Sequence, residues 1–487
     1  MTQTAKPVGS TLNSMESEKS LASSTAEERI RDYRELQKAG LICLHDDFMP
    51  SVHYPQITMY PPVTQEEFYQ GYTCPEENRF VVYVHIPFCK RRCTFCHYPN
   101  KFGDHHAEEK DYYLSTLERE MDIYMKLLNI DAINARSILI GGGTPTFLTP
   151  KQLDRFLRYF TDRVDLSRST QFNYDVDPET IIGPEGEERL EIMKRYGVDR
   201  LTIGIQSLDP RILKLMNRHH TVEQAIESVK MTQKMGFQLN IEFIYGYPGQ
   251  TVQDWKDDME RAVALGVDEI QIYRLKVIPY GDQVGTITTQ FSKDKSDFVP
   301  IEDTLVMKQL AIEILAREGY HENLRRVYSK NPRHFSHYAH DQCCNLFDCL
   351  GFGLSAFNSL RDRFSINSQY FKEYYAAIEQ GRLPLNRGLV RDADAQRRWS
   401  AILPLKNRNI VKRRFQKRNG ISVQEVFGHK IEKLKQYGLV YEDEHKIEVT
   451  AKGSFFADEV VQSFHHPDFM PFPRDKYADG ELNPYLP

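Results

Sequence analysis

Three cysteines lie close together in the segment HIPFCKRRCTFCHYP, which runs from His85 to Pro99. Cys89, Cys93 and Cys96 form a CxxxCxxC pattern, in a chain of 487 residues with eight cysteines in total. Thiolates are soft ligands that suit zinc or iron–sulfur clusters. A closed structural zinc site usually needs two separated ligand pairs, and no second CxxC or HxxxH pair accompanies this loop. Three cysteines on one loop can instead hold three corners of a [4Fe–4S] cube and leave the fourth iron open.

The composition predicts a cytoplasmic protein. No apolar run approaches the roughly 18 residues of a membrane span, and the first residues lack the apolar segment of a secretory signal. In a reducing cytosol, closely spaced cysteines bind metal more often than they form disulfides. The net charge of −5 gives no electrostatic reason to expect nucleic acid or an anionic membrane as a partner.

Short β-rich runs alternate with helical stretches in the first two thirds of the chain. This alternation predicts a parallel sheet of βα units, as either an open doubly wound sheet or an incomplete barrel. In both architectures ligands gather at the carboxyl ends of the strands. The runs are Phe80–Ile86, Ser137–Gly142, Phe172–Asp177, Arg200–Ser207, Leu239–Gly246 and Glu269–Val277.

The residues that could do chemistry fall at these strand ends. Because the carboxyl ends of parallel strands meet at one edge of a sheet, we expect their side chains to lie near one another. They are Cys89 after the first run, GGGTPT (Gly141–Thr146) after the second, Asp175 and Asp177 in the third, Gln206 in the fourth and YGYPGQT (Tyr245–Thr251) after the fifth.

After about Pro300 the alternation stops. From about Asp392, helices and a hairpin, GLVYEDEHKIEVT, predict a small winged-helix-like domain. Its stretch KNRNIVKRRFQKR is basic and raises DNA binding as an alternative. The acidic surroundings, and the presence of one such module alone, disfavour that alternative.

CxxxCxxC after a first barrel strand is the signature of radical S-adenosylmethionine (SAM) enzymes. YVHIPFC, GGGTPT, GIQS, MNRHHT and IYGYPGQT follow one another in this order, and the ordered set resembles the oxygen-independent coproporphyrinogen dehydrogenase family. That family includes haem chaperones, haem-degrading methyltransferases and cyclopropanases. The resemblance covers about Asn78 to Phe464, including YYAAIEQGRLPLNRG (Tyr374–Gly388).

The resemblance implies an α/β fold, an incomplete parallel (β/α)6 radical SAM barrel followed by a winged-helix-like α+β domain. It also implies a [4Fe–4S] cluster, reductive cleavage of SAM to a 5′-deoxyadenosyl radical, and an electron donor such as flavodoxin or ferredoxin. The expected divisions are a disordered segment at 1–28, an arm at 29–78, the radical SAM core at 79–300, a substrate-facing extension at 301–390, the winged-helix-like domain at 391–470 and a tail at 471–487.

The resemblance also assigns site residues. Cys89, Cys93 and Cys96 would hold the cluster. Two residues are expected to be catalytic: Tyr83, near the SAM sulfonium, and Glu242, at a second SAM. The remaining SAM contacts would be backbone approach at Gly142 and Gly143, the Thr144 hydroxyl, and hydrogen bonds from Asp175, Gln206 and Arg218 to the ribose or the carboxylate.

The sequence departs from the dehydrogenase pattern at several places. His97 and Tyr98 stand where the dehydrogenase has Gly-Cys after the third cysteine, and Asp175 and Glu242 exchange the usual Glu and Asp. The segment SKNPRHFSHYAHDQCCN replaces a motif that we expect to face the substrate. Its His and Cys side chains have two alternative roles: they form part of the packed core, or they bind a second metal. The candidate ligands are His334, His337, His340, Cys343, Cys344 and Cys349.

Three functions remain open. The altered segment favours a two-SAM enzyme that transfers a methyl or methylene carbon to an unsaturated small molecule. The dehydrogenase-like carboxyl-terminal third keeps oxidative decarboxylation of a tetrapyrrole propionate as the alternative. The last of the three functions is a haem chaperone without catalysis. It is disfavoured because the chaperones' His-Asn-x-x-Tyr-Trp segment is missing.

Overall fold

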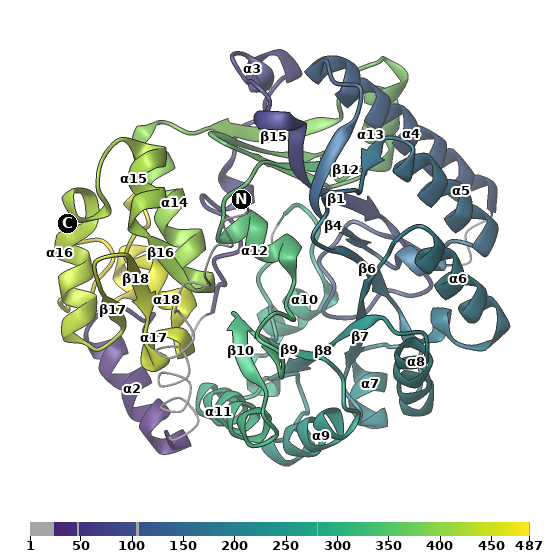
Figure 1. Ribbon diagram of the computed structural model, residues 1–487. Coiled ribbons are helices and arrows are strands. Elements are labelled where there is room, and N and C mark those ends of the chain that lie inside the picture. Colours follow the sequence, from purple (N-terminus) through teal and green to yellow (C-terminus); the bar gives the residue numbers. More distant parts are fainter. Residues whose placement is uncertain (1–23, 46–47, 104–106, 280, 487) are drawn as a thin grey trace, which may run out of the picture.

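The computed structural model describes residues 24–45, 48–103, 107–279 and 281–486 (Figure 1). Most of the segment expected to be disordered, residues 1–23, lies outside the described residues. Its last residues already belong to helix α2 (Ala26–Lys38), where Thr25 and Glu28 form a capping box. Among the described residues, no helix is both long and apolar enough to cross a bilayer.

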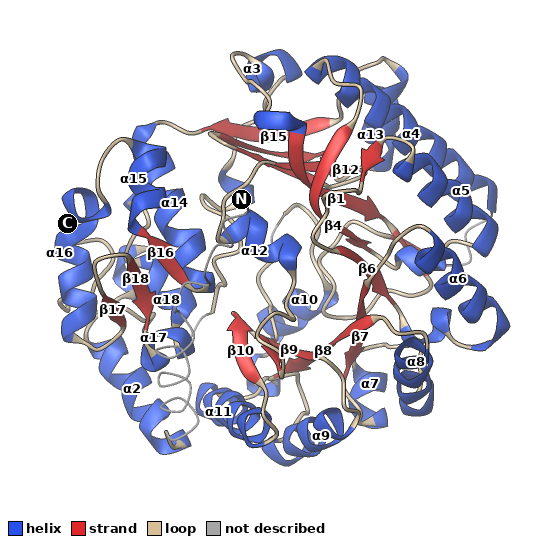
Figure 2. Ribbon diagram, in the orientation of Figure 1, coloured by secondary structure: helices blue, strands red, loops and turns tan. Residues whose placement is uncertain are grey.

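A thirteen-stranded mixed sheet forms the centre of the molecule. Six parallel strands occupy the ranges that the alternation predicted, and the sheet is curved, with helices on its outer face (Figure 2). The predicted incomplete barrel is therefore confirmed. The six strands are β1 (Arg79–Ile86), β4 (Ile133–Gly142), β6 (Phe172–Val176), β7 (Arg200–Gln206), β8 (Gln238–Tyr245) and β9 (Glu269–Arg274).

Additional strands extend this sheet at both edges. Strand β12 pairs in parallel with β1, and an antiparallel run continues from it, while a hairpin pairs with β9 at the other edge. Strand β5 (Val164–Asp165) pairs with β4. The strands are β12 (Cys349–Phe352), β13 (Phe357–Leu360), β14 (Arg363–Asn367) and β15 (Leu385–Val390) at one edge, and β10 (His321–Leu324) and β11 (Val327–Ser329) at the other.

Helices cover the outer face of the curved sheet. Several begin at a Thr-x-x-Gln or Thr-x-x-Asp capping box in the connection that follows a strand, as at Thr149, Thr221 and Thr251, so the local sequence determines where each helix starts. The helices of this layer are α4 (Ala107–Leu128), α5 (Pro150–Thr161), α6 (Gly183–Arg195), α7 (Pro210–Leu215), α8 (Val222–Lys234), α9 (Val252–Ala264) and α11 (Ile301–Arg317). The shorter helices α3 (Gln65–Tyr69), α10 (Thr286–Lys293) and α13 (Phe371–Glu379) pack at its margins.

Alternate residues of each strand face different environments. On β1, Phe80, Val82 and Val84 belong to the main core beneath the helices, whereas Val81 and Tyr83 belong to a separate cluster on the inner face. The base of the interior is polar. There the buried Arg200 guanidinium donates to both Glu269 carboxylate oxygens, at 3.0 and 2.6 Å. This buried, hydrogen-bonded ion pair fills the barrel interior near the amino ends of the strands.

Helix α12 (His337–Cys343) also packs at the amino ends of the strands. The Ser137 hydroxyl donates to Asp341 at 2.9 Å, and Gln171 bonds the backbone at Phe335 and at His337. Ser137 lies on β4, and Gln171 immediately precedes β6, so these contacts lie away from the cysteine loop at the carboxyl end of β1. Tyr338 of the same helix lies against Tyr83 on the inner face, with 6.1 Å between ring centroids, so the expectation that this segment faces the substrate stays a prediction.

The histidines and cysteines of the same region do not gather around one point. His334 approaches Asp268 at 3.3 Å, and the side chains of Asn345 and His340 lie 3.2 Å apart. Cys344 and Cys349 are buried in different apolar clusters. Within the described part of the chain, these residues form no set of His, Cys, Asp or Glu ligand atoms that lie within 4.8 Å of one another.

The carboxyl-terminal domain combines a three-stranded antiparallel sheet with helices, beside the open edge of the barrel (Figure 1). Its basic stretch docks onto the barrel: Arg414 and Arg418 donate to the backbone carbonyls of Cys344 and Leu346, both at 2.9 Å. These contacts give Arg414 and Arg418, two of the basic residues that suggested DNA binding, a role in packing. The elements are α14 (Ala393–Asn407), β16 (Asn409–Val411), α15 (Lys412–Asn419), α16 (Val423–Gln436), β17 (Val440–Glu442), β18 (Lys446–Val449), α17 (Ala451–Phe455) and α18 (Ala457–Gln462).

Candidate active site at the carboxyl ends of the barrel strands

The three cysteines lie on one loop between β1 and α4. Two short strands, β2 (Phe88–Cys89) and β3 (Lys101–Phe102), pair in parallel and close the base of this loop. The Cys96 amide also donates to the Cys93 carbonyl at 3.1 Å, which forms a turn between two of the cysteines. All three are partly exposed and carry free thiols, so the loop presents three sulfurs that a metal centre can reach.

The spacing of the sulfurs does not suit a single ion. In a tetrahedral zinc site with Zn–S bonds of about 2.3 Å, the sulfurs lie about 3.8 Å apart. Among the described residues, one group of potential ligand atoms lies entirely within 4.8 Å, and it consists of Asp177, Glu179 and His219. The sulfurs of the three cysteines are not that close to one another. Three thiolates spread more widely, with no fourth cysteine beside them in the loop, fit three corners of a [4Fe–4S] cluster.

Each cysteine sulfur has one side-chain donor near it. Arg218 Nη1 lies 3.2 Å from the sulfur of Cys93, and the Thr144 hydroxyl lies 3.5 Å from that of Cys89. The Asn100 amide lies 3.9 Å from the sulfur of Cys96. Hydrogen bonds to cluster sulfurs are one of the means by which proteins set cluster potentials.

Burial opposes ionisation of the Cys89 and Cys96 thiols in the absence of a metal. It raises the pKa of Cys89 to about 12 and that of Cys96 to about 11. Metal coordination deprotonates a thiol outright. The loop is therefore a poor thiolate nucleophile by itself and a suitable ligand set once a metal centre is bound.

Arg218 is held in place by a buried carboxylate. Its Nη2 donates to Asp177 Oδ2 at 2.9 Å and to the Gly204 carbonyl at 2.6 Å, and His219 contacts the other oxygen of Asp177 at 3.0 Å. Burial alone would raise the pKa of Asp177, but the Arg218 and His219 charges outweigh it and hold that pKa well below its usual range. Because Asp177 is already ion-paired with Arg218, its carboxylate is not free to bind a metal together with Glu179 and His219.

The glycines after β4 let backbone and side chains approach closely. Gly142 has φ +113°, and a Cβ there would lie 2.8 Å from the His85 ring. At Gly143 a Cβ would lie 2.8 Å from the Phe88 carbonyl oxygen and 2.9 Å from the Cys89 sulfur. The turn can therefore accept only glycine beside the cysteine loop, and the predicted approach of its backbone to SAM stays a prediction.

Tyr83 and His85 lie on the inner face of β1. The Tyr83 hydroxyl and His85 Nδ1 are 2.9 Å apart, and the Tyr83 ring stacks on Phe357 at 5.5 Å. Burial lowers the pKa of His85 to about 4, so its ring is neutral. His85 was not among the predicted site residues, although HIPFC contains it directly before the first cysteine. No signal in the sequence showed that its ring supports both Tyr83 and Gly142.

Two half-buried carboxylates lie on either side of β7. Asp175 pairs in register with Thr202, and Glu242 pairs with Gly204. The Tyr273 hydroxyl, which the sequence analysis also missed, donates to Glu242 at 3.0 Å. Burial and then the Glu242 charge raise the pKa of Asp175 to about 8, and burial also raises that of Glu242. Asp175 therefore keeps its proton at neutral pH and can both donate and accept a hydrogen bond.

Replacing Asp175 by Asn is expected to make stability less dependent on pH. The pKa of Asp175 is raised in the folded protein to about 8, so folding takes up a proton between an unfolded value of about 4 and that value. Wild-type stability therefore falls as the pH rises through this window, and Asp175→Asn removes that loss. Urea midpoints of both proteins from about pH 5 to about pH 9 test this. Parallel curves would show that Asp175 is ionised throughout.

Gln206 ends β7 in an unusual backbone conformation. It has φ +73°, is buried, and its amide nitrogen would lie 2.9 Å from a Cβ at Gly204. Non-glycine residues in this region cost free energy and are found where the surrounding structure requires them. The strain places the Gln206 side chain beside Gly204, whose carbonyl Arg218 also contacts.

The structure thus brings the predicted residues to one end of the barrel. The cysteine loop, the glycine turn, Arg218 and Gln206 adjoin one another, and Tyr83, Asp175 and Glu242 lie deeper on the inner face. The arrangement combines three free thiols, a close-approach turn, and polar groups of both charges. It can bind a metal cluster together with a ligand that carries both charged and hydroxyl groups.

Comparisons with known proteins agree with this geometry. Residues 83–262 match the Radical SAM superfamily model. The chain is 24% identical over 392 residues to the heme chaperone HemW of Bacillus subtilis (strain 168), covering 78% of this chain and 98% of that protein. It is 25% identical over 434 residues to the oxygen-independent coproporphyrinogen III oxidase of Escherichia coli (strain K12), covering 84% and 92%. The solved structure of coproporphyrinogen III oxidase (HemN) from Escherichia coli, 25% identical, superimposes with a TM-score of 0.68 over 79% of this chain and 90% of that chain.

The fold and the cysteine site define a radical SAM enzyme. Within that superfamily, the chain is similar to the HemN-like proteins over most of its length. A [4Fe–4S] cluster and SAM are the cofactors of this class, and the cluster supplies the electron that cleaves SAM. The three thiols and the glycine turn beside them are compatible with both cofactors.

Proposed function

We propose that the chain is a radical SAM enzyme of the coproporphyrinogen III oxidase type, which oxidatively decarboxylates propionate side chains of a porphyrinogen. The observation that carries this proposal is the extent of the likeness to coproporphyrinogen III oxidase, which covers 79% of this chain in the structural superposition and 84% in the sequence comparison. The names of the relatives give no support to the carbon transfer that we expected from the sequence, and they fit the decarboxylase better.

The same proposal assigns roles to the site residues. Cys89, Cys93 and Cys96 hold the cluster, and the backbone at Gly142 and Gly143 lies against the amino acid end of SAM. Thr144, Asp175, Gln206 and Arg218 are the nearby polar groups, and Tyr83 and Glu242 line the interior. A small electron donor such as flavodoxin or ferredoxin would reduce the cluster through the partly exposed cysteine loop.

The test is product analysis with coproporphyrinogen III. The anaerobically reconstituted and reduced protein is incubated with SAM and this substrate, and the porphyrinogens and SAM products are separated. We expect vinyl groups in place of propionates, with carbon dioxide, methionine and 5′-deoxyadenosine released. For each propionate, 5′-deoxyadenosine carries away one hydrogen atom, and the second electron, left when carbon dioxide departs, passes to an added one-electron acceptor. Glu242→Ala should reduce vinyl formation more than it reduces SAM cleavage without substrate.

Two other outcomes would replace the proposal. Release of S-adenosylhomocysteine alongside 5′-deoxyadenosine, with no vinyl product, would indicate a second SAM and carbon transfer. Stoichiometric binding of heme with no conversion of coproporphyrinogen III would indicate a chaperone like the HemW relatives. The Cys89→Ala variant is the control for products that form without SAM cleavage.

A further inference from the structure

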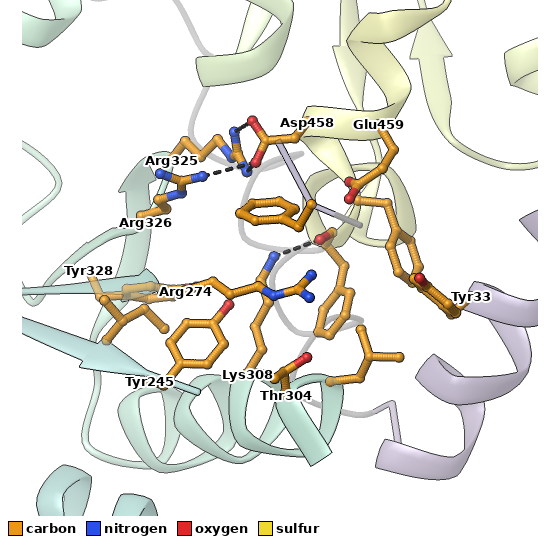
Figure 3. A pocket seen from close by; sticks show the side chains of 15 residues that line it. Tyr33, Tyr245, Arg274, Thr304, Lys308, Arg325, Arg326, Tyr328, Asp458 and Glu459 are labelled. Carbon is orange, nitrogen blue, oxygen red and sulfur yellow. Dashed lines mark hydrogen bonds and ion pairs between the residues drawn. The ribbon is translucent and has the colours of Figure 1, made fainter. Parts of the chain in front are cut away.

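A cavity lies where the edge of the barrel meets the carboxyl-terminal domain (Figure 3). It encloses about 550 Å³ of empty space, part of it open to solvent. Strand ends of β8 and β9, helix α11 and the β10–β11 hairpin form one wall. Helices α17 and α18 and the aromatic rings of Tyr33 and Phe48 form the other. Residues far apart in the sequence therefore build a single enclosed space.

This cavity is separate from the barrel interior. Tyr245 and Ile272, which line it, belong to the core cluster on the outer face of the sheet. Because side chains alternate along a strand, Glu242 on β8 and Tyr273 on β9 face the opposite side. Whatever binds in the cavity therefore does not share the site that holds the cluster and SAM.

The lining carries more positive than negative charge. Its cationic side chains are Arg274, Lys308, Arg325 and Arg326, and its two carboxylates are Asp458 and Glu459, so the cations exceed the carboxylates by two. Buried charges in proteins are normally paired, because an unpaired ion loses its hydration without compensation.

Three of these six groups are paired with one another, and a fourth bonds to the backbone. Asp458 accepts from both terminal nitrogens of Arg325, one of them at 2.6 Å, and from Arg326 at 2.9 Å. The Lys308 ammonium donates to the Phe455 carbonyl at 2.6 Å. One carboxylate thus serves two guanidinium groups, and Glu459 forms no ion pair with any described residue.

Arg274 is the cation that remains. Its guanidinium lies over the Phe48 ring at 4.4 Å. Within the described part of the chain no carboxylate lies within 4.0 Å of it, although its charge acts on Glu459: burial raises the pKa of that carboxyl, and Arg274 partly lowers it. Figure 3 shows the Arg274 and Lys308 side chains reaching into the same part of the cavity. In addition, the Arg325 side chain is only 7% exposed, and its buried Nε has no hydrogen-bond partner.

We propose that this cavity binds a small oxyanion, a carboxylate or a phosphate group, with Arg274 as its principal ligand. Guanidinium groups bind both anions through paired hydrogen bonds. The aromatic side chains of the wall limit the space, and only a small part of it is wide enough for a water-sized sphere, so the bound group is small. The anion would join the barrel edge to the carboxyl-terminal domain, and the proposal does not depend on the proposed function.

The test uses the full-length holoenzyme with inorganic phosphate and with acetate as separate probes, against chloride at matched ionic strength. We expect a saturable rise in the melting temperature with at least one probe, since a ligand that binds only the folded state stabilises it. Arg274→Gln should weaken that probe's binding by at least about tenfold. Arg274→Lys should retain part of it. The probe that binds more tightly identifies the class of oxyanion.

Arg158→Gln is the matched control, because Arg158 is an exposed arginine with a single surface ion pair. Its response to both probes should equal that of the wild type. If Arg274→Gln does not fold, hydrogen exchange of the wild type replaces it: the bound probe should slow exchange at 454–459 and 325–328. The proposal fails if neither probe binds saturably, if Arg274→Gln binds as tightly as wild type, or if these segments gain no protection.

Discussion

Replacing Cys89, Cys93 and Cys96 together by alanine is expected to abolish the brown chromophore and all cleavage of SAM. The three sulfurs lie on one loop, and no other group of cysteines in the described residues is placed to substitute for them. Wild-type protein reconstituted anaerobically should hold about four irons and about four sulfides per chain. The triple variant should hold essentially none, as measured by iron and sulfide analysis and by absorption.

The matched control is Cys74→Ala. Cys74 is also a partly exposed free cysteine, but it lies in the amino-terminal arm and contacts the Leu128 carbonyl instead of the loop. This variant should retain a full cluster. A full cluster in the triple variant would contradict the assignment of the loop and would direct attention to Cys343, Cys344 and Cys349.

Gly143→Val is expected to abolish SAM binding and to reduce the cluster content as well. The first carbon of the new side chain would lie 2.8 Å from the Phe88 carbonyl oxygen and 2.9 Å from the Cys89 sulfur. Neither position is compatible with van der Waals contact, and one neighbour is backbone that cannot rotate away. Equilibrium binding of SAM and iron analysis of the same preparation measure the two effects separately.

Gly236→Ala serves as the control for loss of a glycine, because a Cβ there meets no heavy atom within 4 Å. It should bind SAM and retain its cluster as the wild type does, with at most a modest loss of stability from its positive φ. Normal SAM binding and turnover in Gly143→Val would show that the turn after β4 has no part in holding the cofactors.

The parallel strands were predictable because each is marked by a local sequence pattern, and that pattern recurs along the chain. Each strand is a short apolar run, and capping residues such as Thr149 mark the start of the helix that follows. The edge strands β12–β15 were missed. They are four to six residues long and include Gly351, Asn358 and Ser365, so they lack a strong apolar alternation. Their pairing with β1 depends on contacts distant in sequence.

The sequence predicted which residues gather at this end of the barrel but not which of them contact one another. The order of motifs indicated Arg218 and Thr144 as polar groups near SAM, but in the structure both approach cysteine sulfurs. The residues that contact the predicted site groups are His85, Tyr273 and Asp177. Each either lies on a different strand from the group that it contacts or reaches that group because of the local backbone conformation. Sequence order does not show which side chains meet when parallel strands are brought together, and a single chain offers no other guide.

Asp458 has a consequence for attempts to divide the protein. Besides Arg325 and Arg326 it accepts from the Ser51 amide at 3.1 Å, so one carboxylate on α18 joins the amino-terminal arm, the barrel edge and the carboxyl-terminal domain. A barrel truncated before residue 391 would leave both arginines without their counter-ion. The barrel is therefore not an independent module, and a shortened protein for crystallisation or for fusion should keep all three segments together.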